Sequence, residues 1–251
     1  TSNLDVIDVD GAANFAADVT FADGADIITA SAGTSNVRIG VNAGNSIASG
    51  GNYNVVVGDE AGTALTTGDN NVAIGYAALD AEDTGGNSVA IGYNALTAQN
   101  NDAANYNTAV GASAGAAITT GVQNTIVGAL AGDALTDADF NVAVGINALT
   151  SDTLGSQSTA VGDNTLAAQN FTTATDTLNV AVGISAGKSI TTGIRNTIIG
   201  ALAGDALTDA DENIAIGKSA LSLDTLGSRT TAIGKSALAN QNFTTATNSY
   251  N

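Results

Sequence analysis

The chain has 251 residues, of which 44% are hydrophobic, but Trp and Met are absent and only 4% are aromatic. It contains no Cys and no His, which excludes disulfides and thiolate chemistry and removes the commonest general base. The formal net charge of −18 argues against nucleic acid and anionic lipid as partners, because both require a basic surface. No apolar run is long enough to cross a bilayer, so we expect no membrane insertion.

Residues 1–35 lie outside the regular part of the sequence. The stretch LDVIDVDGAANFAADVTFADGADIITA alternates loosely between apolar and polar residues and has turns centred on Gly. We expect this segment to be an N-terminal lead-in of short strands, followed by a separate repeat array over residues 36–251.

From residue 36 onward, a Val or Ile followed by Gly recurs twelve times, at spacings of 17 to 21 residues. The residue four before each Gly is Asn in nine copies, and the residue three before is always Val, Ile or Thr. The alternating run Asn71-Val72-Ala73-Ile74-Gly75 is typical of a β-strand. A strand that returns every 17 residues predicts an all-β fold, a parallel β-solenoid (β-roll or β-helix) of about twelve stacked coils.

The alternation also predicts which way each strand faces. Val72 and Ile74 share one face of their strand, and Ala73 lies on the other. We expect the β-branched face to form the core and the Ala columns to offer a close-packing surface for a partner. The Asn positions should form a ladder along the rod, and each repeated Gly should make a tight corner.

A longer period of four coils is superimposed on the period of about 17 residues. The residue four after Gly reads Gly, Gly, Leu, Leu three times, while the residue seven after reads Ile, Leu, acid, Gln three times. Where the first position is Gly the second is a large aliphatic residue, so we expect one aliphatic side chain per coil to fill the same space. The superrepeat blocks span 36–106, 107–178 and 179–250, and GALAGDALTDAD occurs identically at 128–139 and 200–211.

The strings NVAIGYAAL at 71–79 and NTAVGASAG at 107–115 resemble the coils of phage tail fibre shafts, especially those of marine phages. The string NSVAIG at 87–92 is also similar to the heads of trimeric autotransporter adhesins. The resemblance covers about residues 36–251 and implies a parallel homotrimer of left-handed β-solenoids. It implies a non-enzymatic, structural fibre segment, which is the shaft or receptor-presenting part of a tail fibre located on the virion.

Other functions stay open at this point. The runner-up is the head of a bacterial surface adhesin, located outside the cell, and the third class is an ice-binding or Ca²⁺-dependent solenoid. Thr stands three before Gly in five coils, which is fewer than an ice-binding array needs, and we interpret that face as core. A host or surface receptor, including a glycan, is the expected partner besides the chain itself.

Two sets of candidate site residues emerge. The repeated corners DALTDAD offer carboxylates that could bind Ca²⁺, although they lack the fixed Gly and terminal Glu of an EF-hand loop and also fit solvated acidic turns. These carboxylates belong to Asp133, Asp137, Asp139, Asp205, Asp209 and Asp211. The longer coils carry aromatic residues that could contact a receptor or pack locally on the solenoid, namely Tyr106, Phe171 and Phe243. No catalytic constellation and no cofactor motif is visible, so we expect no enzyme.

Overall fold

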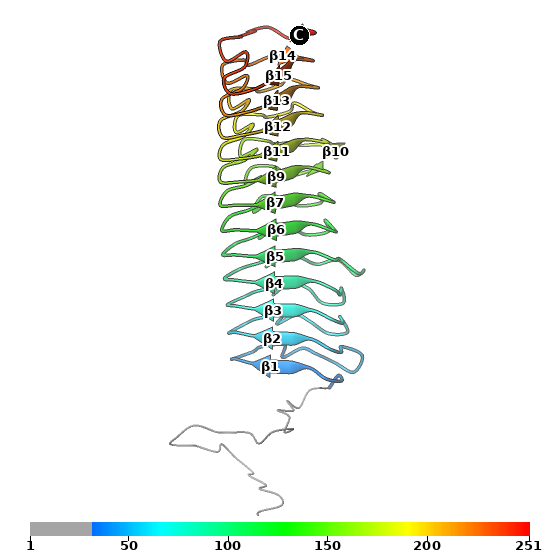
Figure 1. Cartoon of the computed structure of the whole chain (residues 1–251). Helices are drawn as coiled ribbons and strands as arrows, with labels where there is room; N and C mark the ends of the chain where they lie inside the picture. The colour runs from blue at the N-terminus through cyan, green and yellow to red at the C-terminus, as the bar shows by residue number, and fades with distance from the viewer. Residues whose placement is uncertain (1–31) are drawn as a thin grey trace, which may run out of the picture.

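The computed structural model describes residues 32–251, and these residues form an all-β fold without a helix. The chain winds into an elongated rod in which every coil places one strand at the same position above the previous strand (Figure 1). The solenoid predicted from the repeat is therefore confirmed. The lead-in expected over residues 1–35 lies almost entirely outside the described residues.

One parallel sheet of twelve strands runs the length of the rod (Figure 1). Each strand has three residues and pairs in register with the strand of the next coil, as Val72 does with Val55 and Val89. The strands are β1 (Val37–Ile39), β2 (Val55–Val57), β3 (Val72–Ile74), β4 (Val89–Ile91), β5 (Thr108–Val110), β6 (Thr125–Val127), β7 (Val142–Val144), β9 (Thr159–Val161), β11 (Val180–Val182), β12 (Thr197–Ile199), β13 (Ile214–Ile216) and β15 (Thr231–Ile233).

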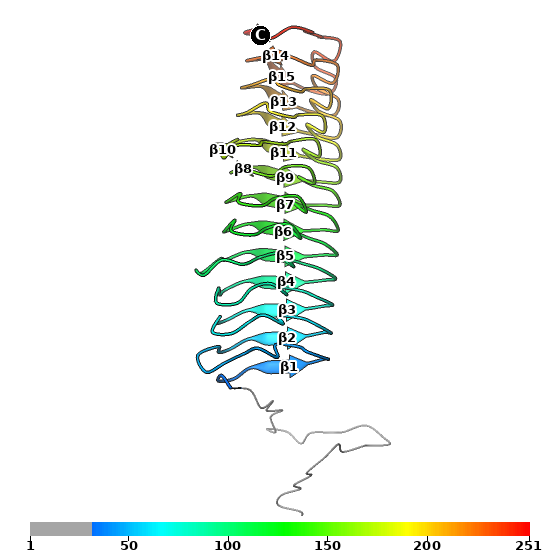
Figure 2. The same cartoon turned by 180° about the vertical axis from the view of Figure 1, so that it is seen from behind.

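The longer coils add two small parallel sheets beside the main one. β8 (Gly155–Ser156) pairs with β10 (Thr175–Asp176), and β14 (Gly227–Ser228) pairs with β16 (Thr247–Asn248). Both β8 and β10 lie at one side of the rod, away from the main sheet (Figure 2). A single bridge between Gly86 and Ala104 occupies the corresponding place in the first block.

The strands face the opposite way from our expectation. Ala73 is fully buried, whereas Val72 and Ile74 on either side of it are only partly buried. From β2 to β15 the middle residue of every strand in the main sheet is buried, and it is Ala in all of them except Val56, Ile126 and Ile198. The Ala columns therefore line the core and the β-branched columns face outward. The prediction failed because the interior of a 17-residue coil is narrow. Every coil except the last already buries a Leu or Ile from its turns, and in most coils only a small strand residue then fits inward.

The prediction that one aliphatic side chain per coil alternates between the positions four and seven after Gly is confirmed. A Cβ added at Gly132 would come within 2.9 Å of Cδ1 of Leu135, so the two positions of this coil share one space. In the next coil Leu149 is fully buried at the position equivalent to Gly132, with a φ of 54°. Every coil except the last thus buries one large aliphatic side chain at this level of the core, and the equivalent Leu238 of the last coil is 39% exposed.

The Gly and Asn columns lock successive coils together. Gly145 has a φ of 136°, and a Cβ there would lie 2.4 Å from the carbonyl oxygen of Gly162 in the next coil, so the tight corner also needs close backbone approach. Asn141 accepts a hydrogen bond from the N–H of Ser158 (2.8 Å) and donates Nδ2 to the carbonyl of Gly155 (2.9 Å). The predicted Asn ladder exists, and it runs mainly from side chain to the backbone of the next coil.

Candidate functional site

The outward face of the twelve-stranded sheet carries a continuous surface of Val, Ile and Thr side chains. We call it the sheet face, and it consists of the first and third residues of each strand in the main sheet. All 24 positions carry Val, Ile or Thr, and none carries a charge. Several are more than a third exposed, including Val127, Val180, Ile199 and Ile214. Monomeric soluble proteins rarely expose large contiguous apolar surfaces.

Two columns of mostly exposed side chains border the sheet face. The entry column contains the residue five before each repeated Gly, together with Tyr250, which occupies the same position one coil beyond Arg229. Every one of these residues is exposed with a φ between 53° and 63°. Its members are Ser35, Tyr53, Asn70, Asn87, Tyr106, Gln123, Phe140, Gln157, Leu178, Arg195, Glu212, Arg229 and Tyr250. The exit column contains the residue directly after each Gly. Its members are Val41, Asp59, Tyr76, Tyr93, Ala112, Ala129, Ile146, Asp163, Ile184, Ala201, Lys218 and Lys235.

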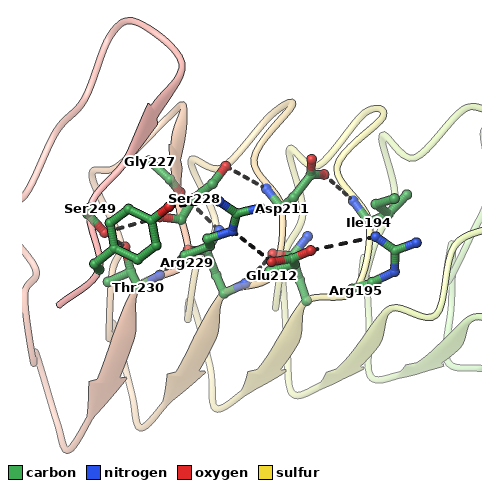
Figure 3. A network of polar contacts seen from close by, with 12 residues as sticks. Ile194, Arg195, Asp211, Glu212, Gly227, Ser228, Arg229, Thr230 and Ser249 are labelled. Atoms are coloured by element: carbon green, nitrogen blue, oxygen red, sulfur yellow. Dashed lines mark hydrogen bonds and ion pairs between the residues drawn. The ribbon is translucent and has the colours of Figure 1, made fainter.

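Near the C-terminal end, the entry column becomes a ladder of charges (Figure 3). Glu212 lies 3.6 Å from Arg195 and 2.9 Å from Arg229, which belong to the coils before and after it. Arg229 also donates to the hydroxyl of Tyr250 (2.9 Å) and lies over its ring. The hydrogen bond from Arg229, aided by its charge, lowers the pKa of Glu212 below its ordinary value. These contacts join four successive coils on the surface.

The three aromatic receptor candidates do not form one patch. Tyr106 is exposed in the entry column beside β5, whereas Phe171 is buried between β9 and β11. The backbone N–H of Phe171 donates to Asp152 (3.0 Å), and its carbonyl accepts from Leu154 (3.0 Å). Phe243 is partly buried and makes the equivalent bond to Asp224. The local-packing interpretation therefore describes Phe171 and Phe243, and Tyr106 is the candidate that stays open to a partner.

The acidic corners are tied to neighbouring coils. Asp137 accepts from the hydroxyl of Thr120 (2.6 Å), Asp133 from that of Thr150 (2.7 Å), and Asp139 from the N–H of Val122 (2.8 Å). Asp209 and Asp211 repeat two of these bonds with Thr192 and Ile194. Asp205 differs, because one of its carboxylate oxygens is buried without a hydrogen-bond partner and burial raises its pKa. Between residues 32 and 251, no three acidic side chains gather in a group that could hold a metal ion.

Once in every block, the core contains a polar cluster that the sequence did not reveal. We call it the polar junction, and it occurs where Ser or Thr replaces the ladder Asn. In the first block, Gln99 donates to Glu82 (3.0 Å) and to Ser88 (2.9 Å), and it accepts from Asn107 (2.8 Å). Glu82, Ser88, Gln99 and Asn107 are all at most 1% exposed. Gln99 thus bridges the gap that the missing Asn leaves. The later junctions are built on Asp152 with Gln169 and on Asp224 with Gln241.

Glu82 should make folding depend on pH. Burial is the main cause that raises its pKa above the ordinary 4.5, although hydrogen bonds from Gln99, Gly85 and Asn105 oppose the shift. Because the folded pKa exceeds the unfolded one, the contribution of Glu82 to stability is present below the unfolded pKa and is lost as pH rises through the folded pKa. Relative to Glu82→Gln, the wild-type free energy of unfolding should fall between pH 4 and pH 7 in urea titrations.

Glu212→Gln provides the control of opposite sign, since the pKa of Glu212 is lowered. Relative to that variant, the wild type should lose stability as pH falls. A wild-type difference from Glu82→Gln that stays constant between pH 4 and pH 7 would contradict the raised pKa.

Comparison with protein-family models, with curated proteins and with solved structures finds no match to this chain. The described part of the chain also has no helix long and apolar enough to cross a membrane.

Proposed function

We propose that this chain is a non-enzymatic segment of a trimeric fibre, in which three solenoids pack through their sheet faces. The observation that carries the proposal is the unbroken Val, Ile and Thr surface on all twelve strands. In this role the rod holds a binding element at a fixed distance from its anchor, as a tail fibre shaft does. Three chains acting together would also give avidity without strong individual contacts.

The dimensions of the sheet face support association. Twelve strands at a spacing of about 4.8 Å span about 58 Å, and three residues span about 10 Å, which gives a flat area of roughly 600 Å². The bordering columns widen this strip, and in a trimer each chain would divide it between two neighbours. Since the inward Ala columns leave little room for large side chains, burying the outward face against copies adds the apolar burial that a thin coil lacks.

The test is the mass in solution, measured by light scattering on a size-exclusion column. We expect three times the 24.4 kDa of one chain, eluting early for that mass because the particle is elongated. Val144→Glu places a charge in the middle of the sheet face and should give folded monomers. Leu223→Glu is the matched control, because Leu223 is 53% exposed outside the sheet face and both columns, so this variant should stay trimeric.

A wild-type protein that is folded and monomeric would contradict the fibre proposal. That outcome would favour ice binding, because the Thr positions that we interpreted as core in fact face outward in five strands, as Thr108 and Thr125 do. Thermal hysteresis would then be the deciding measurement. If the trimer is found, the adhesin head is the remaining alternative to the tail fibre, and the domains encoded beside this segment would separate the two.

A further inference from the structure

We propose that Arg38 closes the N-terminal end of the solenoid core, because its side chain takes the place of a preceding coil and prevents another coil from stacking there. The proposal goes beyond the fibre proposal and holds for any number of chains in the rod. It rests on a comparison of the first coil with the coils that open the second and third blocks.

Arg38 departs from the repeat at a position that belongs to the core. It is the middle residue of β1 and pairs with Val56 in β2. The middle residue of every other strand in the main sheet is Ala, Val or Ile, and in the coils that open the later blocks it is Ala109 and Ala181. Arg38 is only partly buried. A charged side chain in this column requires a polar partner and access to solvent, because burying an isolated charge is costly.

In the later blocks, a Leu of the preceding coil fills the space that Arg38 occupies in the first coil. A Cβ added at the Gly four residues after the corner would lie 3.0 Å from Cδ2 of this Leu in both blocks. The pairs are Gly115 with Leu96 and Gly187 with Leu166. In the first coil, a Cβ added at the equivalent Gly44 would instead meet Nε of Arg38 at 3.5 Å. Arg38 therefore supplies volume that a preceding coil supplies elsewhere.

Arg38 also replaces a hydrogen-bond donor of the preceding coil. The same Leu residues donate their backbone N–H to the carbonyl of the residue three after the corner Gly. The pairs are Leu96 with Ala114 (3.1 Å) and Leu166 with Ala186 (3.2 Å). In the first coil the equivalent carbonyl belongs to Ala43, and Nε of Arg38 donates to it (2.8 Å). One side chain thus reproduces both a packing contact and a backbone hydrogen bond of a preceding coil.

This replacement closes one end of the rod to further strands. A coil stacked against β1 would bring its Leu and the N–H of that Leu to places that Arg38 already fills, and it would bury the guanidinium. The other end differs, because no atom lies within 4 Å of a Cβ added at Gly234, and Leu238, the equivalent of Leu96 and Leu166, is 39% exposed. Since an open sheet edge can pair with other chains, Arg38 protects the N-terminal end from such pairing.

Chains that are extended by one coil test whether Arg38 prevents stacking. A copy of residues 180–196 joined after Asn251 adds a coil with Ala181 at the inward position, and a copy of residues 37–54 adds the same type of coil with Arg38. In the first extended chain, the N–H of Leu238 should bond to the added coil as that of Leu166 does to Ala186. Its hydrogen exchange should therefore slow by at least about tenfold. In the second, the exchange of Leu238 should stay as fast as in the unextended chain.

The matched control is the 37–54 extension in which only the copied Arg38 is replaced by Ala. This chain should slow the exchange of Leu238 as the 180–196 extension does. Slow exchange with the extension that keeps Arg38 would overturn the proposal, and so would fast exchange in the Ala control when the 180–196 extension slows it. Light scattering on the same chains tests the fibre proposal separately, since a monomer and a trimer both report the exchange of Leu238.

Arg38→Ala in the unextended chain gives a second test that does not depend on an added coil. Gly44 donates its N–H to the next coil (2.9 Å), and uncovering it should speed its exchange by at least about tenfold, while Gly115 should not change. Arg38→Ile is the matched control and should keep Gly44 slow, because Ile126 reaches the equivalent Gly of its own coil, 3.1 Å from the added Cβ. Unchanged exchange of Gly44 in Arg38→Ala would show that Arg38 does not close the core.

Discussion

Gly145→Ala should destabilise the rod far more than Gly234→Ala, although both replace the same Gly of the repeat. Ala at a φ of 136° or 121° costs about 1–3 kcal/mol of backbone strain in either variant. In Gly145→Ala the new Cβ would also lie 2.4 Å from the carbonyl oxygen of Gly162, so the two coils must separate. At Gly234 no atom lies within 4 Å of the added Cβ. We expect Gly145→Ala to lose at least about 2 kcal/mol more.

Urea or thermal unfolding at one protein concentration measures this difference. Because each coil contacts only its neighbours, a break beside β7 should also divide the array, so unfolding should show two transitions in place of one. Gly234→Ala should keep a single transition with a slightly lower midpoint. Equal losses in the two variants would show that backbone strain alone fixes the Gly column, and the close approach of coils would then carry no energetic weight.

Gly132→Leu and Leu135→Ala should compensate each other. Alone, Leu135→Ala opens a cavity that costs about 2–5 kcal/mol, and Gly132→Leu overpacks the same space at a cost of about 1–3 kcal/mol. A Leu at this backbone position is possible, because Leu149 has it one coil later with a φ of 54°. The double variant should therefore lose at least about 1 kcal/mol less than the sum of the single losses, as measured by urea unfolding.

The identical repeat supplies a matched control for this coupling. Gly204 and Leu207 occupy the same positions 72 residues later, and a Cβ at Gly204 would lie 2.9 Å from Cδ1 of Leu207. Gly204→Leu with Leu207→Ala should show the same compensation. Gly132→Leu with Leu207→Ala joins residues from different coils, so those losses should add. Compensation in this mixed pair would mean that the effect does not come from shared space.

The sequence predicted the features that depend on repetition along the axis. The strand positions, the Gly corner at Gly145 and the Asn ladder at Asn141 all follow from identical residues that stack at a fixed period. The exchange between Gly132 and Leu135 was also predictable, because a narrow core conserves its volume. Each of these features is local to one position of the coil and repeats in its neighbours.

The features that depend on the cross-section of the coil were not predictable in the same way. Alternation in Val72-Ala73-Ile74 separates two faces but does not say which face is inside, and hydrophobicity suggested the wrong one. The space inside the coil could have indicated the right face, because a core that already holds Leu79 has little room for Ile74 as well. The burial of Glu82 gave no such signal. A carboxylate in the core becomes tolerable only through donors from Gln99, Gly85 and Asn105, which lie as far as 23 residues away.

The polar junctions also favour changes of rod length by whole blocks of four coils. Because Gln99 bonds Ser88 of its own coil and Glu82 of the coil before, inserting a coil between Glu82 and Gln99 would separate these partners. Inserting or deleting a whole block of four coils would restore every contact. Duplication of a whole block would therefore lengthen the rod by about 19 Å, four times the strand spacing, without disturbing a junction. The identical dodecamers at 128–139 and 200–211 are what such a step leaves in the sequence.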